Sequence, residues 1–345
     1  MSQVSRQHAA KRTQKKGDAL KRIFLHIGQP KTATTTIQNF LSINQAKLIK
    51  HGWLYPNAGR QYAAHHLLGN FFRAAPIHWI GQADPAQVMA DLKREIDESN
   101  CDNIILSTES LYFAENPDQF AAYLKDFDVS VVVFLRRQDE WIESAYQENL
   151  KNGETRLGPE GYLAALSNSL AYADRIATWA AAFGKRKILV HGFEATAEKL
   201  PVEQVFMNLI GAPFVPDLVL PPTQNERLNR DCTTFLIMFA ASPRVDLKHQ
   251  MIKDILVKYS QANPDTASLR NVYPPQRRHE IVESRNEGNA IVARDYLGRT
   301  DGRLFLKPLP VPDDPWEAYP GLRVQKSVAI AEFLASEMYK LMTLK

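Results

Sequence analysis

Four short segments of the chain are almost continuously apolar, and longer segments with helical periodicity lie between them. Such segments, rich in Ile, Val, Leu and Phe, are typical of strands buried in a parallel sheet. They cover residues 22–27, 102–107, 129–135 and 187–191. Helical patterns cover residues 34–50, 86–98, 118–126, 139–150 and 162–183. The alternation predicts an α/β fold in which helices flank a parallel sheet.

The pattern changes after about residue 195. A segment with four prolines, residues 211–223, is interpreted as a linker. Helical patterns follow at residues 227–241, 246–261 and 276–296, then a second proline-rich loop at 307–321 and a last helix at 324–343. We therefore predict an α/β core at residues 21–222 and a mainly helical C-terminal extension, residues 223–345, packed on it.

Charge and cysteine content narrow the class of protein. Lys and Arg number 42 against 38 Asp and Glu, and the net charge of +4 does not indicate nucleic-acid binding. Seven of the basic residues lie in the first 22 positions, without the apolar segment of a signal peptide. Residues 1–20 are expected to form a disordered basic tail, for which peripheral membrane contact stays open. Two isolated cysteines, no metal-ligand spacing and no apolar run of membrane-span length favour a cytoplasmic protein without a metal.

The segment HIGQPKTATTTIQNFL, residues 26–41, joins the first strand to the first helix. Such a turn points the free N–H groups and the positive dipole end of the helix at one place, which favours a phosphate or sulfate. Lys31 adds a full charge. Hydroxyl donors follow at Thr32, Thr34, Thr35 and Thr36. Threonines also cap helices that bind nothing, but the strand–turn–helix setting favours an anion site.

This anion site is not a Walker A loop. That motif, G-x-x-x-x-G-K-[ST], carries its lysine at the end of a glycine-rich loop. Here Lys31 follows Pro30 directly, and Gly28 is the only nearby glycine. A kinase or ATPase of the usual kind is therefore disfavoured.

A second candidate site follows the strand at 129–135. Arg136 comes at its end, and Ser144 lies eight residues later, two turns into a predicted helix. A guanidinium grips a phosphate through two parallel bonds, and a serine hydroxyl adds a third. Together with the Lys31 turn at another strand end, this pair predicts a nucleotide with two separate phosphate groups.

These two motifs resemble those of PAPS-dependent sulfotransferases, in particular the bacterial sulfotransferase-like branch. Residues 30–35, PKTATT, are similar to the family's 5′-phosphosulfate loop, P-K-[ST]-G-T-T, and Arg136 with Ser144 is similar to its 3′-phosphate motif. Residues 170–184 and 288–305 extend the resemblance. It implies a P-loop-like fold, PAPS (3′-phosphoadenosine 5′-phosphosulfate) as cosubstrate and no metal. It also implies that PAPS contacts Pro30, Lys31, Thr32, Ala33, Thr34, Thr35, Thr36, Arg136 and Ser144.

The chain departs from the family pattern in two places. Ala33 stands where the family has glycine. A positive φ would strain an alanine, so we expect Ala33 in the right-handed helical region at the start of the helix. The late R-K-G loop, another 3′-phosphate contact of the family's cytosolic enzymes, is not visible, and Arg227 and Arg230 are candidates to replace it.

Sulfuryl transfer needs stabilised charge on the leaving oxygen and a base for the acceptor hydroxyl. Lys31 is assigned to the leaving oxygen. Glu109, just after the strand at 102–107, stands where the resemblance implies a base, and His65 and His66 are its competitors. A helix-capping glutamate and polar surface histidines are the structural alternatives.

Two other functions stay open: a phosphoryl-transfer enzyme and a non-catalytic nucleotide-binding protein on the same fold.

The group that receives the sulfuryl group is expected to be a hydroxyl or an amine. An aromatic-rich stretch, residues 53–79, suggests a glycan or glycolipid, although core packing explains most of its rings.

Overall fold

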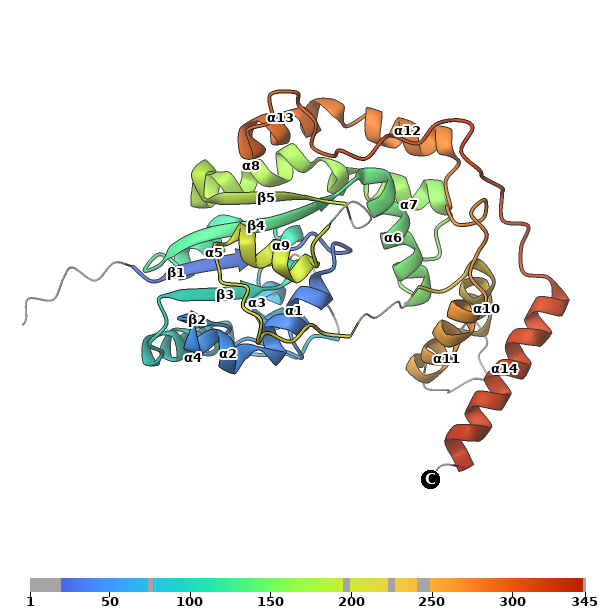
Figure 1. Ribbon diagram of the computed structural model, residues 1–345, viewed down its shortest axis with the longest axis horizontal. Coiled ribbons are helices and arrows are strands. Elements are labelled where there is room, and N and C mark those ends of the chain that lie inside the picture. Colours follow the sequence, from blue (N-terminus) through green and yellow to red (C-terminus); the bar gives the residue numbers. More distant parts are fainter. Residues whose placement is uncertain are drawn as a thin grey trace, which may run out of the picture.

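A single five-stranded sheet organises the protein (Figure 1). The computed structural model describes residues 20–73, 77, 79–194, 199–222, 227–240 and 249–343. All described strand pairs are parallel, in the order β2-β3-β1-β4-β5. The strands are β1 (Arg22–His26), β2 (Trp53–Leu54), β3 (Asn103–Ser107), β4 (Asp128–Arg136) and β5 (Ile188–Phe193). The predicted α/β class and its four strands are confirmed, and only β2, two residues long, was too short for a pattern to reveal.

The sheet separates two apolar cores, because successive side chains of a strand point to opposite faces. Ile23 and Leu25 face one core, and Phe24 faces the other. The first core is covered by α4 (Pro85–Glu98), α5 (Pro117–Tyr123), α8 (Tyr172–Phe183) and α13 (Asn286–Leu297). The second is covered by α1 (Thr34–Ile43), α2 (Gln45–Lys50) and α9 (Val202–Leu209). Each fully buried Leu, Ile or Phe contributes about 1.5–3 kcal/mol.

Short elements connect these layers at the carboxyl ends of the strands. They are α3 (His66–Asn70), η1 (Glu109–Phe113), α6 (Gln138–Lys151), α7 (Pro159–Ala165), η2 (Ser167–Leu170) and α12 (Pro275–Glu283). By the geometry of open α/β sheets, the carboxyl-end edge is where ligands bind. At the opposite edge, η3 (Lys185–Lys187) leads directly into the amino end of β5.

Three helices predicted as continuous are interrupted in the structure. The segment 34–50 breaks at Asn44, whose side-chain amide donates to Phe40 O and to Val219 O. The segment 162–183 divides into α7, η2 and α8, and the segment 276–296 divides into α12 and α13. Hydrophobic periodicity continues across such breaks, so the pattern could not place them.

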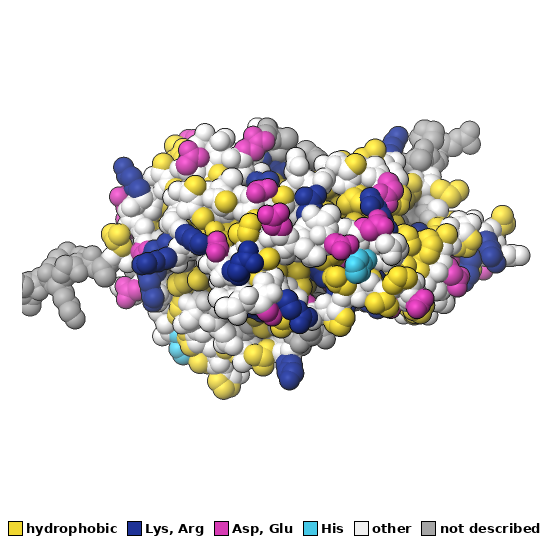
Figure 2. Space-filling model, turned by 90° about the horizontal axis from the view of Figure 1, so that it is seen from above, with side chains coloured by type: hydrophobic (Ala, Val, Ile, Leu, Met, Phe, Trp, Pro, Cys, Tyr) yellow, Lys and Arg dark blue, Asp and Glu magenta, His cyan; other side chains and the backbone are white. Residues whose placement is uncertain are grey.

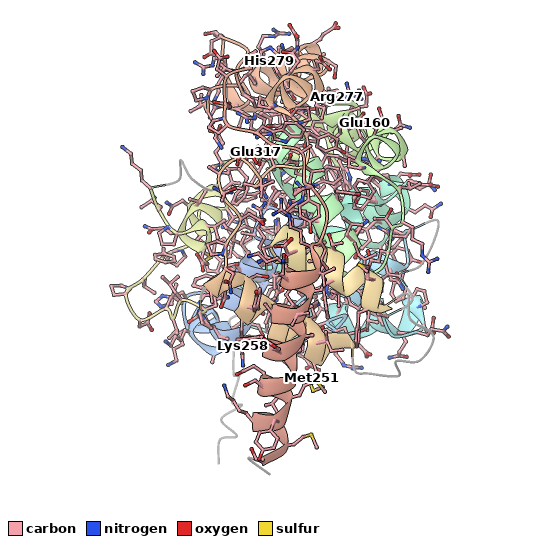
Figure 3. The ribbon with its side chains drawn as sticks, turned by 90° about the vertical axis from the view of Figure 1, so that its right-hand side faces the viewer. Glu160, Met251, Lys258, Arg277, His279 and Glu317 are labelled. Atoms are coloured by element: carbon pink, nitrogen blue, oxygen red, sulfur yellow. The ribbon has the colours of Figure 1, made fainter. Side chains whose placement is uncertain are left out.

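The C-terminal part does two different things. α13 packs in the first core beside the sheet and α12 packs against α6, whereas α10 (Arg230–Ala240), α11 (His249–Ala262) and α14 (Val324–Thr343) enclose an apolar cluster of their own. These three helices lie beyond the carboxyl ends of the strands (Figure 1). Lys258 of α11 pairs with Glu337 of α14 at 3.3 Å. Figure 3 labels Lys258 next to α14, the helix that projects from the molecule. The predicted C-terminal helices are confirmed, and the domain boundary at 222/223 stays a prediction.

The surface seen from the α12–α13 side mixes basic and acidic side chains without a broad patch of one sign (Figure 2). None of the helices in the described segments combines the length and apolarity needed to cross a membrane. The predicted basic tail, apart from Leu20, lies outside the described residues.

Candidate functional site

The turn between β1 and α1 is held tightly by buried polar contacts. Gln29 accepts from the backbone N–H of Arg136 at 3.2 Å and donates to the Tyr172 hydroxyl at 3.3 Å. Trp141 Nε1 donates to Pro30 O at 2.9 Å. A Cβ on Gly28 would lie 2.9 Å from Glu109 Cβ, so only glycine fits there. The turn is thereby fixed against the ends of β3 and β4 before any ligand arrives.

Two residues of this turn adopt left-handed backbone angles. Lys31 has φ 68°, and Ala33 has φ 60° and ψ 29°. The expectation of a right-handed Ala33 is therefore wrong. Left-handed geometry costs a non-glycine residue roughly 1–2 kcal/mol, and the contacts around Gln29 and Pro30 hold the turn in it. A glycine would adopt these angles at this position without that cost.

The start of α1 is prepared for an anion. Its N-cap is Ala33, no side chain caps the helix, and its first turn contains no acidic residue. The orphan N–H groups therefore face the turn together with the positive end of the helix dipole. Thr34 is buried, whereas Thr35 is exposed and Thr36 is partly exposed.

A cavity of about 1380 Å³ opens at this edge of the sheet. It brings together most of the residues that the sequence predicted. They are Pro30, Lys31, Ala33, Thr34, Thr35, Thr36, His66, Glu109, Arg136 and Ser144. Residues that sequence reasoning did not single out also line it, among them Arg73, Glu140, Glu148 and Lys307.

Two predicted site residues lie behind the cavity wall. Thr32 is fully buried, and its hydroxyl donates to Gln29 O at 2.6 Å. His65 is also fully buried: its Nδ1 lies 3.1 Å from the Ser107 N–H and its Nε2 lies 3.1 Å from Pro56 O. Burial lowers the pKa of His65 to about 3. Both residues support the turn and the end of β3 rather than facing a ligand.

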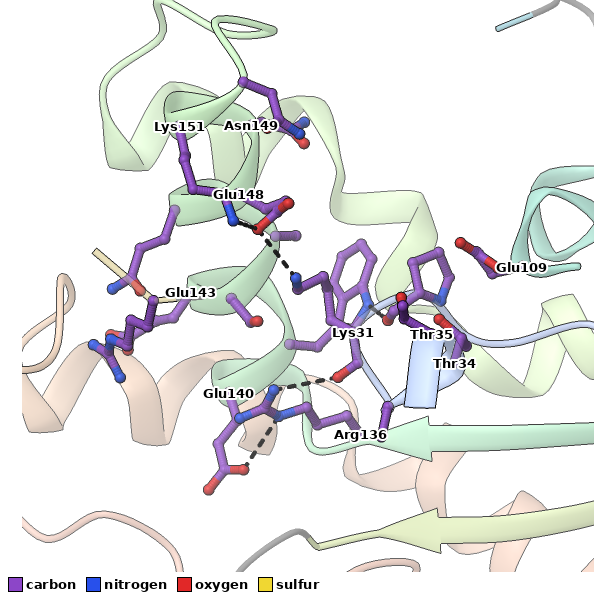
Figure 4. Close-up of a pocket in the computed structure, with 18 of the residues that line it drawn as sticks. Lys31, Thr34, Thr35, Glu109, Arg136, Glu140, Glu143, Glu148, Asn149 and Lys151 are labelled. Carbon is purple, nitrogen blue, oxygen red and sulfur yellow. Dashed lines mark hydrogen bonds and ion pairs between the residues drawn. The ribbon is translucent and has the colours of Figure 1, made fainter. Parts of the chain in front are cut away.

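The two predicted phosphate-binding cations are paired with carboxylates of α6 (Figure 4). Lys31 Nζ lies 3.3 Å from Glu148, which also pairs with Lys151 at 2.7 Å. Arg136 pairs with Glu140 at 3.4 Å and donates to Lys31 O at 3.2 Å. Glu140, Ser144 and Glu148 recur every four residues, so they share one face of α6, which borders the cavity.

These pairs shift the acidity of both carboxylates. Burial by itself would raise the pKa of Glu148, but Lys31 and Lys151 hold it below its ordinary value. Burial would likewise raise the pKa of Glu140. Lys307, Arg136 and Arg137 outweigh burial, so the pKa of Glu140 is also lowered. Both glutamates are therefore ionised at neutral pH and occupy the cations that an anionic ligand would use.

Lys307 reaches the cavity from a C-terminal strap, defined here as residues 304–308. Glu194 accepts from the backbone N–H groups of Leu306 and Lys307 at 2.9 and 2.6 Å, and Arg137 donates to Pro308 O at 2.6 Å. A Cβ on Gly192 would meet Leu304 O at 2.8 Å, so the strap passes too close to β5 for a side chain there. Lys307 Nζ then lies 2.5 Å from Glu140.

A buried charge network anchors this strap. Asp139 is fully buried and accepts from Arg137 at 2.7 and 3.0 Å and from Arg278 of α12 at 2.6 Å. Removing one partner of such a network typically costs 3–5 kcal/mol, because the other charge stays buried. Lys307 was missed from the sequence because it lies in a proline-rich loop whose path depends on these distant contacts.

Arg227 also lines the cavity, whereas Arg230 does not. Arg230 donates to Leu269 O and Asn271 O, and its guanidinium lies 4.8 Å from the centre of the Tyr319 ring. Of the two arginines suggested as replacements for the missing loop, only Arg227 is placed at the site. Burial, and then the neighbouring Arg270, lower its pKa.

Glu109 lies on the other side of Lys31 from Glu148 (Figure 4), and His66 lines the same cavity. Gln38 of α1 donates to Glu109 Oε2 at 2.7 Å and so fixes this carboxylate at the start of η1. The His66 ring packs edge-on against Trp79, with ring centres 5.0 Å apart. Burial lowers the pKa of His66 and nearby Glu109 opposes that shift.

The chemistry of the described residues is that of an anion site with a carboxylate beside it. Within these described segments, no cluster of three His, Cys, Asp or Glu side chains is arranged to hold a metal ion. The cations, helix N-terminus and hydroxyl groups can neutralise a multiply charged ligand, and Glu109 or His66 can accept a proton from a second molecule.

Comparison with known proteins adds a structural likeness. No family model matches the chain, and no curated protein matches it. A solved sulfotransferase from Alicyclobacillus acidocaldarius aligns with a TM-score of 0.39 and 16% sequence identity, covering 72% of this chain and 98% of that one. At this TM-score the likeness carries no weight in the interpretation of the site.

Proposed function

We propose that the protein is a sulfotransferase that moves a sulfuryl group from PAPS to a hydroxyl or amine of an acceptor. One observation carries the proposal: the uncapped start of α1 with Lys31, and Arg136 with Ser144, line a single cavity. These are two anion-binding groups of different design, as a nucleotide with phosphates at two positions requires. Lys307 and Arg227 add cations to the same cavity.

The proposed reaction is an in-line displacement at sulfur. The acceptor oxygen forms the new S–O bond, the bond between sulfur and the bridging phosphate oxygen breaks, and 3′-phosphoadenosine 5′-phosphate (PAP) leaves. Lys31 and the N–H groups of α1 stabilise the charge that collects on the leaving phosphate. Glu109 takes up the proton that the attacking group of the acceptor molecule loses. Gln38 holds the carboxylate in place for this step.

The proposal is tested by incubating the protein with PAPS carrying radiolabelled sulfate and a panel of glycans, lipids and phenols. Transfer of label to one acceptor class, dependent on Lys31, is the expected result. No transfer to any of the three classes, and no PAP formed, would contradict the proposal.

We also infer a cytoplasmic location, supported by Cys101 and Cys232, which are free and buried.

Arg136→Ala is expected to weaken PAP binding much more than binding of adenosine 5′-phosphosulfate, which lacks the 3′-phosphate. A hydrogen bond between charged groups contributes about 1.5–3 kcal/mol, or roughly 10- to 100-fold in affinity. Calorimetric titration of wild type and variant with both nucleotides measures the difference. An equal loss for both would assign Arg136 to another part of the ligand.

Glu148→Gln is expected to tighten PAP binding about fivefold, and by a larger factor at low salt. The carboxylate occupies Lys31 and repels an incoming anion, and two charges about 4 Å apart interact by roughly 1 kcal/mol in water-like surroundings. Glu160→Gln is the control, because Glu160 pairs with Arg277 outside the cavity lining (Figure 3). Unchanged or weaker PAP binding by the Glu148 variant would show that its pairing with Lys31 does not compete with the ligand.

A further inference from the structure

Arg136 binds the 3′-phosphate in the proposed function, and two contacts set the direction of its side chain. Its Nε lies 3.4 Å from Glu140 Oε2, and its Nη1 donates to Lys31 O at 3.2 Å (dashed lines in Figure 4). A guanidinium presents five N–H donors in one rigid plane. Contacts on two different nitrogens therefore fix the plane, and the remaining donors of this cavity-lining arginine can meet an anion.

Glu140 is in turn held through its other oxygen. Lys307 Nζ lies 2.5 Å from Glu140 Oε1, whereas Arg136 contacts Oε2. Arg137 approaches Oε1 from 3.8 Å. The Glu140 side chain is only 15% exposed, so water screens these charges weakly. The carboxylate thus bridges a cation of the C-terminal strap and a cation at the end of β4.

This bridge controls a negative charge beside the anion site. Burial by itself would raise the pKa of Glu140, and Lys307 is the strongest of the basic groups that bring that pKa below its ordinary value. Without Lys307, the negative charge of Glu140 would be balanced mainly by Arg136 and Arg137. It would then compete with a phosphate for Arg136, because opposite charges at this separation attract strongly where water is partly excluded.

The position of Lys307 does not depend on its own ammonium group. Glu194 accepts from the backbone N–H of Lys307 at 2.6 Å, and Arg137 donates to Lys307 O at 3.3 Å and to Pro308 O at 2.6 Å. The Lys307 side chain is 39% exposed, so it is not tightly packed. Replacing that side chain should therefore leave the strap in place and remove only the charge.

We propose that Lys307 is a positioning residue of the nucleotide site: it holds Glu140, and Glu140 orients Arg136 toward the 3′-phosphate. The inference rests on the proposed function and adds a residue to it. Lys307 acts through the carboxylate and does not contact the nucleotide. The orientation of Arg136 therefore depends on a strap residue that lies 167 positions beyond Glu140 in the sequence.

A double-mutant cycle separates action through Glu140 from direct contact with the ligand. PAP affinity is measured by calorimetry for wild type, Lys307→Met, Glu140→Gln and the double variant. The titrations use about 0.15 M salt, at which exposed charges more than about 8 Å apart are largely screened. Methionine keeps an unbranched apolar side chain without the charge, and glutamine keeps the shape of Glu140 without its charge.

Lys307→Met is expected to weaken PAP binding about fivefold in the wild-type background, the effect of one uncompensated charge. In the Glu140→Gln background the same change should weaken it less than about twofold, because no carboxylate then needs a partner. Lys307→Arg should keep most of the affinity, since it retains the charge. Equal losses in the two backgrounds would assign Lys307 to direct contact and overturn the inference, and so would unchanged affinity of Lys307→Met.

Two further measurements exclude a merely structural role. Binding of adenosine 5′-phosphosulfate, which lacks the 3′-phosphate that Arg136 binds, should be nearly the same in Lys307→Met and wild type. An equal loss for both nucleotides would contradict positioning of Arg136. Lys185→Met is the matched control: Lys185 pairs with Asp295 at 2.9 Å but is not part of the cavity lining, so its replacement should leave PAP affinity unchanged.

The inference and the proposed function can fail separately. If PAP binds wild type and the Lys307 effect is the same in both backgrounds, only the inference fails. If PAP does not bind wild type, the proposed function fails, and the four proteins of the cycle are titrated with inorganic sulfate, an anion that a guanidinium binds. A loss of sulfate affinity confined to the wild-type background would then support the role of Lys307. Equal losses, or no binding of sulfate, would overturn it.

Discussion

Lys31→Ala is expected to fold normally and to lose about 10²–10³-fold in turnover of PAPS, the usual effect of removing one transition-state donor. Its side chain is 31% exposed and paired only at 3.3 Å with Glu148, and such pairs contribute about 0–1 kcal/mol to stability. Glu148 keeps Lys151 as a partner at 2.7 Å. The loss should therefore appear in kcat and not in the thermal midpoint.

Lys93→Ala is the control for this result. Lys93 pairs with Asp126 at 3.1 Å on the surface and is not part of the cavity lining, so its removal should leave turnover unchanged. Activity of Lys31→Ala within a few-fold of wild type would remove Lys31 from the chemical step. A loss of turnover accompanied by a fall in the thermal midpoint of Lys31→Ala would assign Lys31 a structural role instead.

Glu109→Gln is expected to bind PAP normally and to lose roughly 10²–10⁴-fold in turnover, the usual contribution of a positioned base. The glutamine keeps the shape of the side chain and can still accept from Gln38, so the start of η1 is preserved. It cannot take up a proton at neutral pH. Steady-state kinetics with saturating PAPS, together with a PAP titration, separates the two effects.

His66→Ala and His65→Ala are made in parallel, because both histidines are rival bases. His66 lines the cavity and its pKa is lowered by burial, so it is neutral at pH 7 and chemically able to accept a proton. His65 is fully buried, and its replacement should reduce stability through the lost contacts to Pro56 and Ser107. An inactive but folded His66 variant beside an active Glu109→Gln would transfer the role of base to His66.

The sequence allowed the sheet to be predicted because its strands are buried on both faces and therefore read as apolar runs. The cavity residues at strand ends were predictable for the same reason: parallel strands bring their carboxyl ends to one edge. Lys31, Glu109 and Arg136 each follow or end such a strand. Side chains whose position is set by local order and sheet topology are accessible to this reasoning.

Other features depend on contacts between distant segments. Lys307 reaches the cavity because Arg137, Glu194 and Gly192 hold a strap more than a hundred residues away in sequence. The left-handed Ala33 depends on a turn fixed by Gln29 and Trp141, which no local preference reveals. Adjacent His65 and His66 look equivalent in sequence. The packing of α3 decides that His65 is buried behind the cavity wall and that His66 lines the cavity.

Differential ligand binding tests the central claim, a PAPS site in this cavity, most directly. Thermal midpoints of the protein are measured with PAP, ATP and GTP at matched concentrations and salt, because a ligand that binds only the folded state raises its stability. The account predicts a clear rise with PAP, which Arg136→Ala reduces, and a much smaller one with ATP or GTP. Equal stabilisation by all three nucleotides, or none by PAP, would contradict it.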